Sequence, residues 1–122
     1  GYTWSYGAGE CDVYLIRTDS SGDTVWTNTY GGTDYDYGFS VVQASDGGYI
    51  ITGKTESYSA AGDYDVWLIK TDANGDTLWT KTYGGSHDDY GYSIVQPSDG
   101  GYIVAGGTRS YGAGSYDVWL IK

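Results

Sequence analysis

The sequence has very little of several residue types, and each shortage excludes a class of protein. It contains no methionine, one phenylalanine, one proline, one cysteine and one histidine, and its only glutamates are Glu10 and Glu56. This scarcity of strong helix formers argues against a helical protein. The single cysteine, Cys11, rules out a disulfide within the chain. Apolar runs such as Val66–Ile69 are far shorter than a membrane-spanning helix.

Positive charge is also scarce. Six basic residues against sixteen acidic ones give a formal net charge of −10. Such a field repels phosphate backbones and anionic lipid, so we expect no nucleic-acid partner and no membrane insertion. The surface composition predicts an extracellular or cell-surface protein. The chain starts at Gly1 rather than Met, which predicts that it is processed, excised or trimmed.

The abundant residues favour β-structure. The chain holds 21 glycines, 15 tyrosines and 5 tryptophans. Glycine permits tight turns, and aromatic and β-branched side chains fit the pleated surface of a strand. We therefore predict an all-β protein.

The sequence repeats itself. Asp12–Lys54 recurs as Asp65–Gly107 at an offset of 53 residues, and 28 of the 43 aligned pairs are identical. A third copy begins at Asp117. At the two ends, Thr3–Arg17 matches Thr108–Lys122 at an offset of 105. Self-similarity at such a period indicates a repeat architecture.

Each full repeat contains four strand-like segments separated by turn residues. In the second copy these segments are Asp65–Thr71, Thr77–Tyr83, Gly91–Gln96 and Tyr102–Gly106. The first of them is apolar on both faces and must be covered on both sides. Four short antiparallel strands in a unit of about fifty residues match the blade of a β-propeller.

The motifs of the second copy also resemble a known family. They are Asp65–Lys70, Asn74–Asp76, Trp79, Tyr83–Gly85 and Asp99–Val104. This pattern is similar to kelch-type blades, and more closely to a bacterial and archaeal family of extracellular propeller repeats. The resemblance implies a secreted or cell-surface propeller with Tyr92–Gln96 innermost and Thr77–Tyr83 outermost. It implies no catalytic residues.

About two blades per chain cannot close a ring. We predict a partial blade over residues 1–38, a full blade over 39–83 and a partial blade over 90–122. Oligomerisation would complete them, with Thr24–Tyr30 of one molecule finishing the sheet that begins near Tyr92 in another. Head-to-tail association of this kind gives a closed ring, for which we predict an even number of blades, or an open filament. The residues expected on the assembly strands are Asp12, Trp26, Trp67, Asp117 and Trp119.

One feature of the ends conflicts with simple completion. Asp12–Arg17 and Asp117–Lys122 are copies of the same strand and compete for one place in a completed blade.

Cys11 occupies the position of Tyr64 and Tyr116, where we expect a half-buried thiol, with an intermolecular bridge as the alternative.

Binding residues are expected in the loops and where the copies differ. Tyr6, Tyr58 and Tyr111 lie in loops rich in Tyr, Ser and Gly, which are adaptable contact surfaces. Plain solvent-facing loops explain the same composition. The positions that differ between the copies are Asp34/His87, Tyr35/Asp88, Lys54/Gly107 and Glu56/Arg109. Together these positions give Tyr6, Tyr58, Tyr111, His87 and Arg109 as candidate contacts to a glycan or a surface protein.

No motif indicates an enzyme. Ser86, His87 and Asp88 adjoin in sequence, whereas the members of a catalytic triad meet in space. Asp72–Asp76 is similar to a calcium loop, but a hairpin turn explains it without a metal. We expect no cofactor, with calcium as the alternative. The sequence thus predicts a non-enzymatic, self-assembling scaffold or protein-interaction module, with a multivalent carbohydrate-binding propeller and a filament subunit as alternatives.

Overall fold

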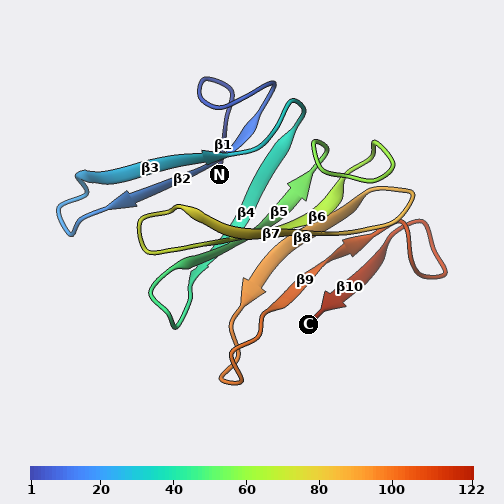
Figure 1. Cartoon of the computed structure of the whole chain (residues 1–122). Coiled ribbons are helices and arrows are strands. Elements are labelled where there is room, and N and C mark those ends of the chain that lie inside the picture. Colours follow the sequence, from blue (N-terminus) through green and yellow to red (C-terminus); the bar gives the residue numbers. More distant parts are fainter.

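The computed structural model describes all 122 residues, Gly1–Lys122, and contains ten strands and no helix (Figure 1). The all-β prediction is confirmed. The strands are β1 (Tyr2–Thr3), β2 (Asp12–Thr18), β3 (Thr24–Tyr30), β4 (Asp36–Gln43), β5 (Tyr49–Thr55), β6 (Asp65–Thr71), β7 (Thr77–Tyr83), β8 (Asp89–Val95), β9 (Ile103–Thr108) and β10 (Asp117–Ile121).

These strands form three antiparallel sheets in chain order (Figure 1). The middle sheet has four strands in the order β4-β5-β6-β7, and the outer sheets have three strands each, β1-β2-β3 and β8-β9-β10. Each strand pairs with its neighbour in sequence, as expected for short turns. The arrangement fits a β-blade fold.

The middle sheet is built around β6. All seven residues of β6 are buried, because the outer sheets cover both of its apolar faces. By contrast, β7 lies at the edge of the sheet, and six of its seven residues are exposed. β8 begins at Asp89, two residues before the predicted start of that strand, because Asp89 pairs with Thr108.

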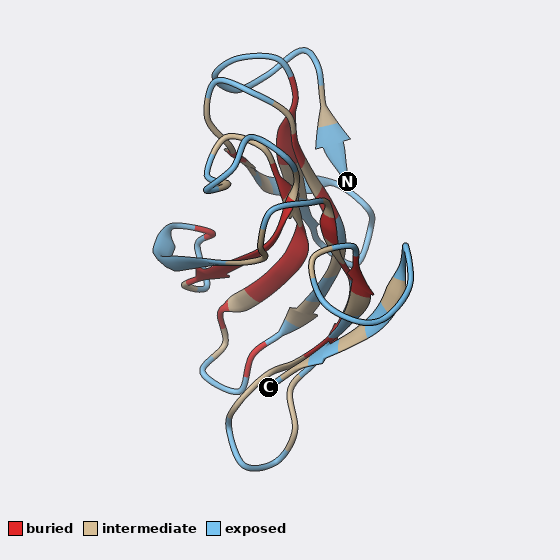
Figure 2. Ribbon diagram, turned by 90° about the vertical axis from the view of Figure 1, so that its right-hand side faces the viewer, coloured by how far each residue is buried: buried red, intermediate tan, exposed pale blue.

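Two apolar clusters hold the sheets together. Figure 2 shows that the buried residues are concentrated in the strands in the middle of the molecule. The first cluster joins the N-terminal and middle sheets and contains Val13, Tyr30, Ile51, Trp67 and Ile69. The second joins the middle and C-terminal sheets and contains Ile50, Val66, Leu68, Ile94 and Val104. Equivalent residues therefore pack at equivalent junctions, as a repeat sequence requires.

The two end sheets are incomplete compared with the middle one. β1 covers only the first two residues of β2, through the pairs Tyr2–Val13 and Thr3–Asp12. β10 pairs with β9 alone. On the outward face of β10, Val118 is 92% exposed, whereas its equivalent Val66 in β6 is fully buried. Each end of the molecule thus presents an unpaired strand edge and an uncovered sheet face.

Candidate functional site: an aromatic band and two open end sheets

Aromatic side chains from all three sheets form one continuous band at the end of the strands where β4 and β8 begin. Its core runs through ring contacts between neighbouring repeats: Tyr37 with Tyr64 at 6.2 Å between ring centres, and Tyr64 with Tyr90, also at 6.2 Å. The period of two along a strand places Tyr37 and Phe39 on one face of β4, and Tyr90 and Tyr92 on one face of β8. The members of the band are Tyr2, Trp4, Tyr35, Tyr37, Phe39, Tyr64, Tyr90, Tyr92 and Tyr116.

A lysine ammonium lies at the centre of this band. Lys54 Nζ is 3.5 Å from the ring centre of Tyr64, 4.7 Å from that of Tyr37 and 4.9 Å from that of Tyr90. Three ring faces around one cation form an aromatic cage, which stabilises the charged form. Burial acts in the opposite direction and lowers the pKa of Lys54. In the next repeat Gly107 takes this position, and the ring of Tyr116 lies against it.

The outer parts of the band are open to solvent. Trp4, Tyr92 and Tyr116 are exposed, and the hydroxyls of Tyr92 and Tyr116 lie 2.7 Å apart. Burial, reinforced by Asp88, raises the pKa of Tyr90 to about 12, so this phenol is neutral at physiological pH. Flat neutral rings beside a few charged groups can stack on a sugar ring or on apolar groups of a protein partner.

Buried carboxylates occur in pairs at the two sheet junctions. Asp12 and Asp36 both approach Gly31, and Asp65 and Asp89 both approach Gly84, where a Cβ atom would collide with either carboxylate. Asp36 accepts hydrogen bonds from Ser57 Oγ at 2.7 Å and from the backbone N–H of Gly32 at 2.9 Å. These carboxylates cap the loops that join the sheets, which is a structural role.

One carboxyl group of each pair has a raised pKa. Burial raises the pKa of Asp12, and the nearby Asp36 raises it further. Burial likewise raises the pKa of Asp65, with Asp89 adding to the shift. Asp12 Oδ1 is buried and has no hydrogen-bond partner. Both junctions are therefore sensitive to the protonation of one carboxyl group.

The three loop tyrosines predicted as ligand contacts occupy different surroundings. The Tyr58 hydroxyl donates to the carbonyl oxygen of Gly31 at 2.9 Å, and the Tyr111 hydroxyl donates to that of Gly84 at 2.8 Å. These two side chains thus tie each loop to the sheet before it. Tyr6 has no such partner and stacks on Tyr14 at 5.9 Å between ring centres.

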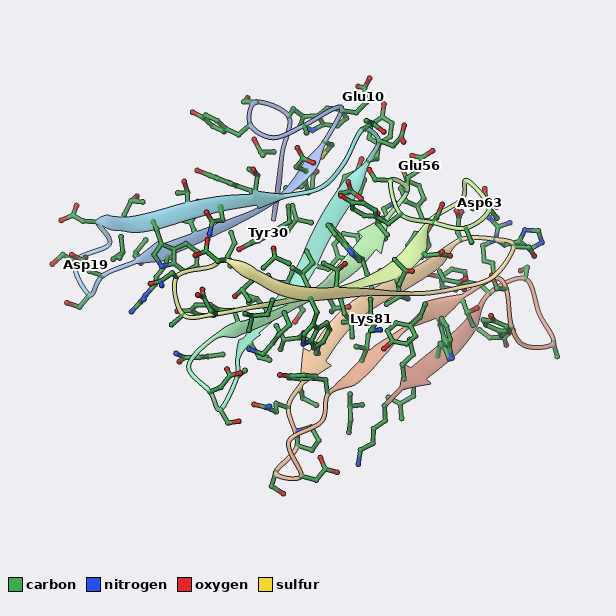
Figure 3. All side chains as sticks on the ribbon, viewed as in Figure 1. Glu10, Asp19, Tyr30, Glu56, Asp63 and Lys81 are labelled. Atoms are coloured by element: carbon green, nitrogen blue, oxygen red, sulfur yellow. The ribbon has the colours of Figure 1, made fainter.

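The other two candidate contacts, Arg109 and His87, are exposed and each lies beside an aspartate. Arg109 Nη1 lies 3.4 Å from Asp88 Oδ2, and His87 Nδ1 lies 3.9 Å from Asp63 Oδ2. Figure 3 shows Asp63 in the same group of loops as Glu10 and Glu56, while Asp19 lies at the far tip of the β2–β3 hairpin. His87 is therefore on the loop end of the sheets, and no hydrogen bond or ion pair joins His87 or Arg109 to Tyr58 or Tyr111.

Some of the residues predicted on assembly strands are buried inside the molecule, and others lie on strands at sheet edges. Asp12 and Trp67 are buried, and Trp67 lies in the middle sheet with its ring 5.2 Å from that of Tyr58. The equivalent Trp119 is half-buried on β10, where it contacts Tyr111. Asp117 begins β10, and Trp26 lies on the edge strand β3. Only the strands that carry Trp26, Asp117 and Trp119 lie at sheet edges.

Cys11 is fully buried rather than half-buried as predicted. It forms a parallel bridge to Tyr35, and its carbonyl oxygen accepts a hydrogen bond from the backbone N–H of Asp36 at 2.7 Å. Burial raises the pKa of its thiol, which keeps the sulfur protonated.

The hairpin turn considered for calcium is held by its own hydrogen bonds. Asp72 Oδ1 accepts from the backbone N–H groups of Asn74 at 2.8 Å and Asp76 at 2.9 Å, which is an Asx turn. No group of three or more His, Cys, Asp or Glu side chains is placed to hold a metal ion. The chain also has no helix that could span a lipid bilayer.

Sequence reasoning did not predict the cage around Lys54. Its rings come from three segments, since Tyr37 is on β4, Tyr64 precedes β6 and Tyr90 is on β8. The difference between Lys54 and Gly107 was visible as a place where the copies diverge. Which rings contact the ammonium depends on how the sheets pack side by side.

No protein-family model matches the chain. The chain is 29% identical over 114 residues to the "Regulatory protein FlaEY" of Caulobacter vibrioides. The match covers 84% of this chain but only 12% of that protein. The chain is therefore similar to a short part of a much longer protein.

Proposed function

We propose that the chain is a non-enzymatic β-propeller repeat module outside the cell, which assembles head to tail with copies of itself and serves as a scaffold or protein-interaction unit. The observation that carries this proposal is the match between its two open ends. The regulatory role named for FlaEY is compatible with an interaction module and offers no reaction to transfer.

The uncovered sheet faces at the two ends carry apolar residues whose repeat equivalents are buried where the sheets pack together inside the molecule. Val118 and Leu120 on the C-terminal sheet are 92% and 68% exposed, and their equivalents Val66 and Leu68 are buried in the second cluster. At the other end, Ile16 is 50% exposed, and its equivalent Ile69 is buried in the first cluster. The C-terminal face of one copy therefore suits the N-terminal face of another.

The two junctions inside the molecule are equivalent, so the same junction can be repeated between copies. Val13, Tyr30 and Ile51 at the first junction correspond to Val66, Tyr83 and Val104 at the second. A third junction of the same kind continues the same rotation, which closes into a ring or, if it does not close, gives a filament. We propose the ring, with a kelch-like blade arrangement.

Native mass spectrometry of the 122-residue chain tests this function. We expect one discrete oligomer whose mass is an integer multiple of the 13.2 kDa protomer. A ladder of increasing masses would support the filament instead. A monomer at all concentrations would contradict self-assembly and would indicate that further repeats of a longer polypeptide cover the open ends.

A second candidate, a carbohydrate-binding propeller, is supported by the aromatic band. The rings of Trp4 and Tyr92 are exposed, and exposed aromatic rings can stack on the apolar face of a sugar. Titration of tryptophan fluorescence with sugars, together with a glycan array, tests it. Trp4→Ala should abolish the response, whereas Trp79→Phe on the outer strand β7 should leave it intact. No response from the wild-type protein would contradict glycan binding.

A further inference from the structure

Two strands of this molecule are copies of one another and fit the same place in a completed blade. Thr3–Arg17 and Thr108–Lys122 are identical at 10 of 15 positions. Their pairing is equivalent as well: Asp12 of β2 pairs with Thr3, and Asp117 of β10 pairs with Thr108. A four-stranded blade built from β8 and β9 has room for only one of these strands before the outermost strand.

We propose that assembly occurs by strand exchange, in which the β2–β3 hairpin of one copy replaces β10 of another copy on the edge of β9. This inference rests on the proposed self-assembly and specifies how the copies join: Val13 and Leu15 of β2 take the places of Val118 and Leu120 in the face that the other copy covers. In the register now used by β10, Asp12 would pair with Thr108 and Leu15 with Ala105 of the other copy. The product is a complete blade, β8-β9-β2-β3, made from two chains.

The attachments of the two strands favour β2 over β10. β2 is joined to β3 through a tight hairpin, and Val13 is buried in the first apolar cluster. The adjoining Cys11 carbonyl accepts the backbone N–H of Asp36, which fixes the start of β2 to the middle sheet. β10 pairs with β9 alone, and two of its five residues are more than two-thirds exposed. Replacing β10 by β2 gives up the packing of Trp119 and Ile121 on the second cluster, puts the equivalent Tyr14 and Ile16 in their place, and adds β3 as a fourth strand.

A cavity beside Gly38 shows where the other copy would fit. It measures about 50 Å³ and is lined by Val13, Leu15, Phe39, Val41 and Ile51. It lies between the N-terminal and middle sheets, where the N-terminal sheet lacks its inner strands.

The equivalent place at the other junction is filled. There Thr52 Oγ1 approaches Gly91, which is the equivalent of Gly38, and both Ile50 and Thr52 are fully buried. The residues of β9 that correspond to Ile50 and Thr52 are Ile103, which is half-buried, and Ala105, which is exposed. Strand exchange would carry these two side chains into the cavity.

The exchange also requires a small rearrangement at the N-terminus. Gly1 lines the cavity, and its carbonyl oxygen lies 3.1 Å from the position that a Cβ of Gly38 would take. β1 pairs with only two residues of β2, so its displacement by β9 costs two residue pairs, and β2 then takes over the pairs that β10 now makes with β9.

The experiment compares two full-length variants that add positive charge to the same face of the C-terminal sheet. Ala105→Lys changes β9, whereas Val118→Lys with Leu120→Lys changes the strand that leaves. Native mass spectrometry and hydrogen exchange of the β10 amides are measured for both variants and for the wild-type protein.

Strand exchange predicts opposite results for these variants. Ala105→Lys should weaken assembly by at least about tenfold, because a charge would enter the apolar cavity. The double variant should assemble within about threefold of wild type, since the changed strand is exposed in the oligomer. In the wild-type oligomer the β10 amides should exchange rapidly, while those of β2 stay protected.

Two outcomes overturn the proposal in distinguishable ways. In the first, the wild-type protein is an oligomer with protected β10 amides, or the double variant no longer assembles. Either result would show that copies associate through the face of β10 without exchange. A monomeric wild-type protein would remove the proposed self-assembly and strand exchange together.

Discussion

Lys54 lies with its ammonium nitrogen 3.5 Å from the centre of the Tyr64 ring, and this pair joins two segments that are ten residues apart in sequence. The Tyr37 and Tyr90 rings complete the cage from the strands on either side. A single cation thus contacts both β4 and β8, which begin the middle and C-terminal sheets. The cage therefore contributes to the junction between these two sheets.

Replacing this cation should weaken the junction. Lys54→Met keeps much of the apolar stem but removes the charge, and we expect a loss of about 1 kcal/mol in the free energy of unfolding. Lys81→Met, on the exposed strand β7, is the matched control and should change stability by less than about 0.5 kcal/mol. Urea denaturation measures both. Equal effects of the two substitutions would contradict a stabilising cage.

The carboxylate pair at Gly84 should make stability depend on pH. Because the pKa of Asp65 is raised in the folded protein, its stabilising contribution is present below the ordinary pKa of about 3.9 and is lost as pH rises through the folded value. Asp65→Asn does not titrate and can still accept the hydrogen bond from Ala60 N–H. We expect the variant to gain stability over wild type as pH increases toward 7.

Unfolding free energies measured across this pH range test the effect. Asp23→Asn, in an exposed turn, serves as the control and should show no such trend. A variant that loses stability equally at every pH would indicate that the carboxylate is needed for its hydrogen bonds alone.

The loop tyrosines allow a matched series. Tyr58→Phe and Tyr111→Phe each remove one hydroxyl that donates to a glycine carbonyl, and each should cost about 1 kcal/mol of unfolding free energy. Tyr6→Phe removes a hydroxyl without a hydrogen-bond partner and should be close to neutral. Thermal denaturation of the three variants provides the measurement. A Tyr6→Phe effect as large as the others would mean that Tyr6 has a partner in solution.

Two equivalent turn glycines should respond differently to alanine. Gly22 and Gly75 have φ angles of +87° and +85°, so either substitution costs about 1 kcal/mol of backbone strain. At Gly75 the new Cβ would also meet the Asn28 side chain and lie 3.1 Å from the Trp26 ring, while at Gly22 it meets nothing. We expect Gly75→Ala to be clearly the more destabilising in urea denaturation. Equal losses would show that the β6–β7 turn does not pack on β3.

Much of the local structure followed from the pattern of residues. The alternation and apolar content of Asp65–Thr71 predicted a strand covered on both sides, and all of β6 is buried. The predicted start of β8 was two residues late, since the strand pairing begins with Asp89 and Thr108, before the apolar residues of the strand. Of the candidate contacts, Tyr58 and Tyr111 form hydrogen bonds between the sheets, which a loop composition alone does not reveal.

The sequence by itself determined the repeat, the strands and their turns, because these depend on neighbouring residues and on the period of two. The tertiary structure decided which side chains meet across sheets: Lys54 with its tyrosines, the carboxylate pairs, and the cavity beside Gly38. Such contacts join positions ten or more residues apart, and their formation depends on how whole sheets pack. The same packing leaves β10 at a sheet edge with one partner strand, and this is the position in which we propose that β2 of another copy replaces it.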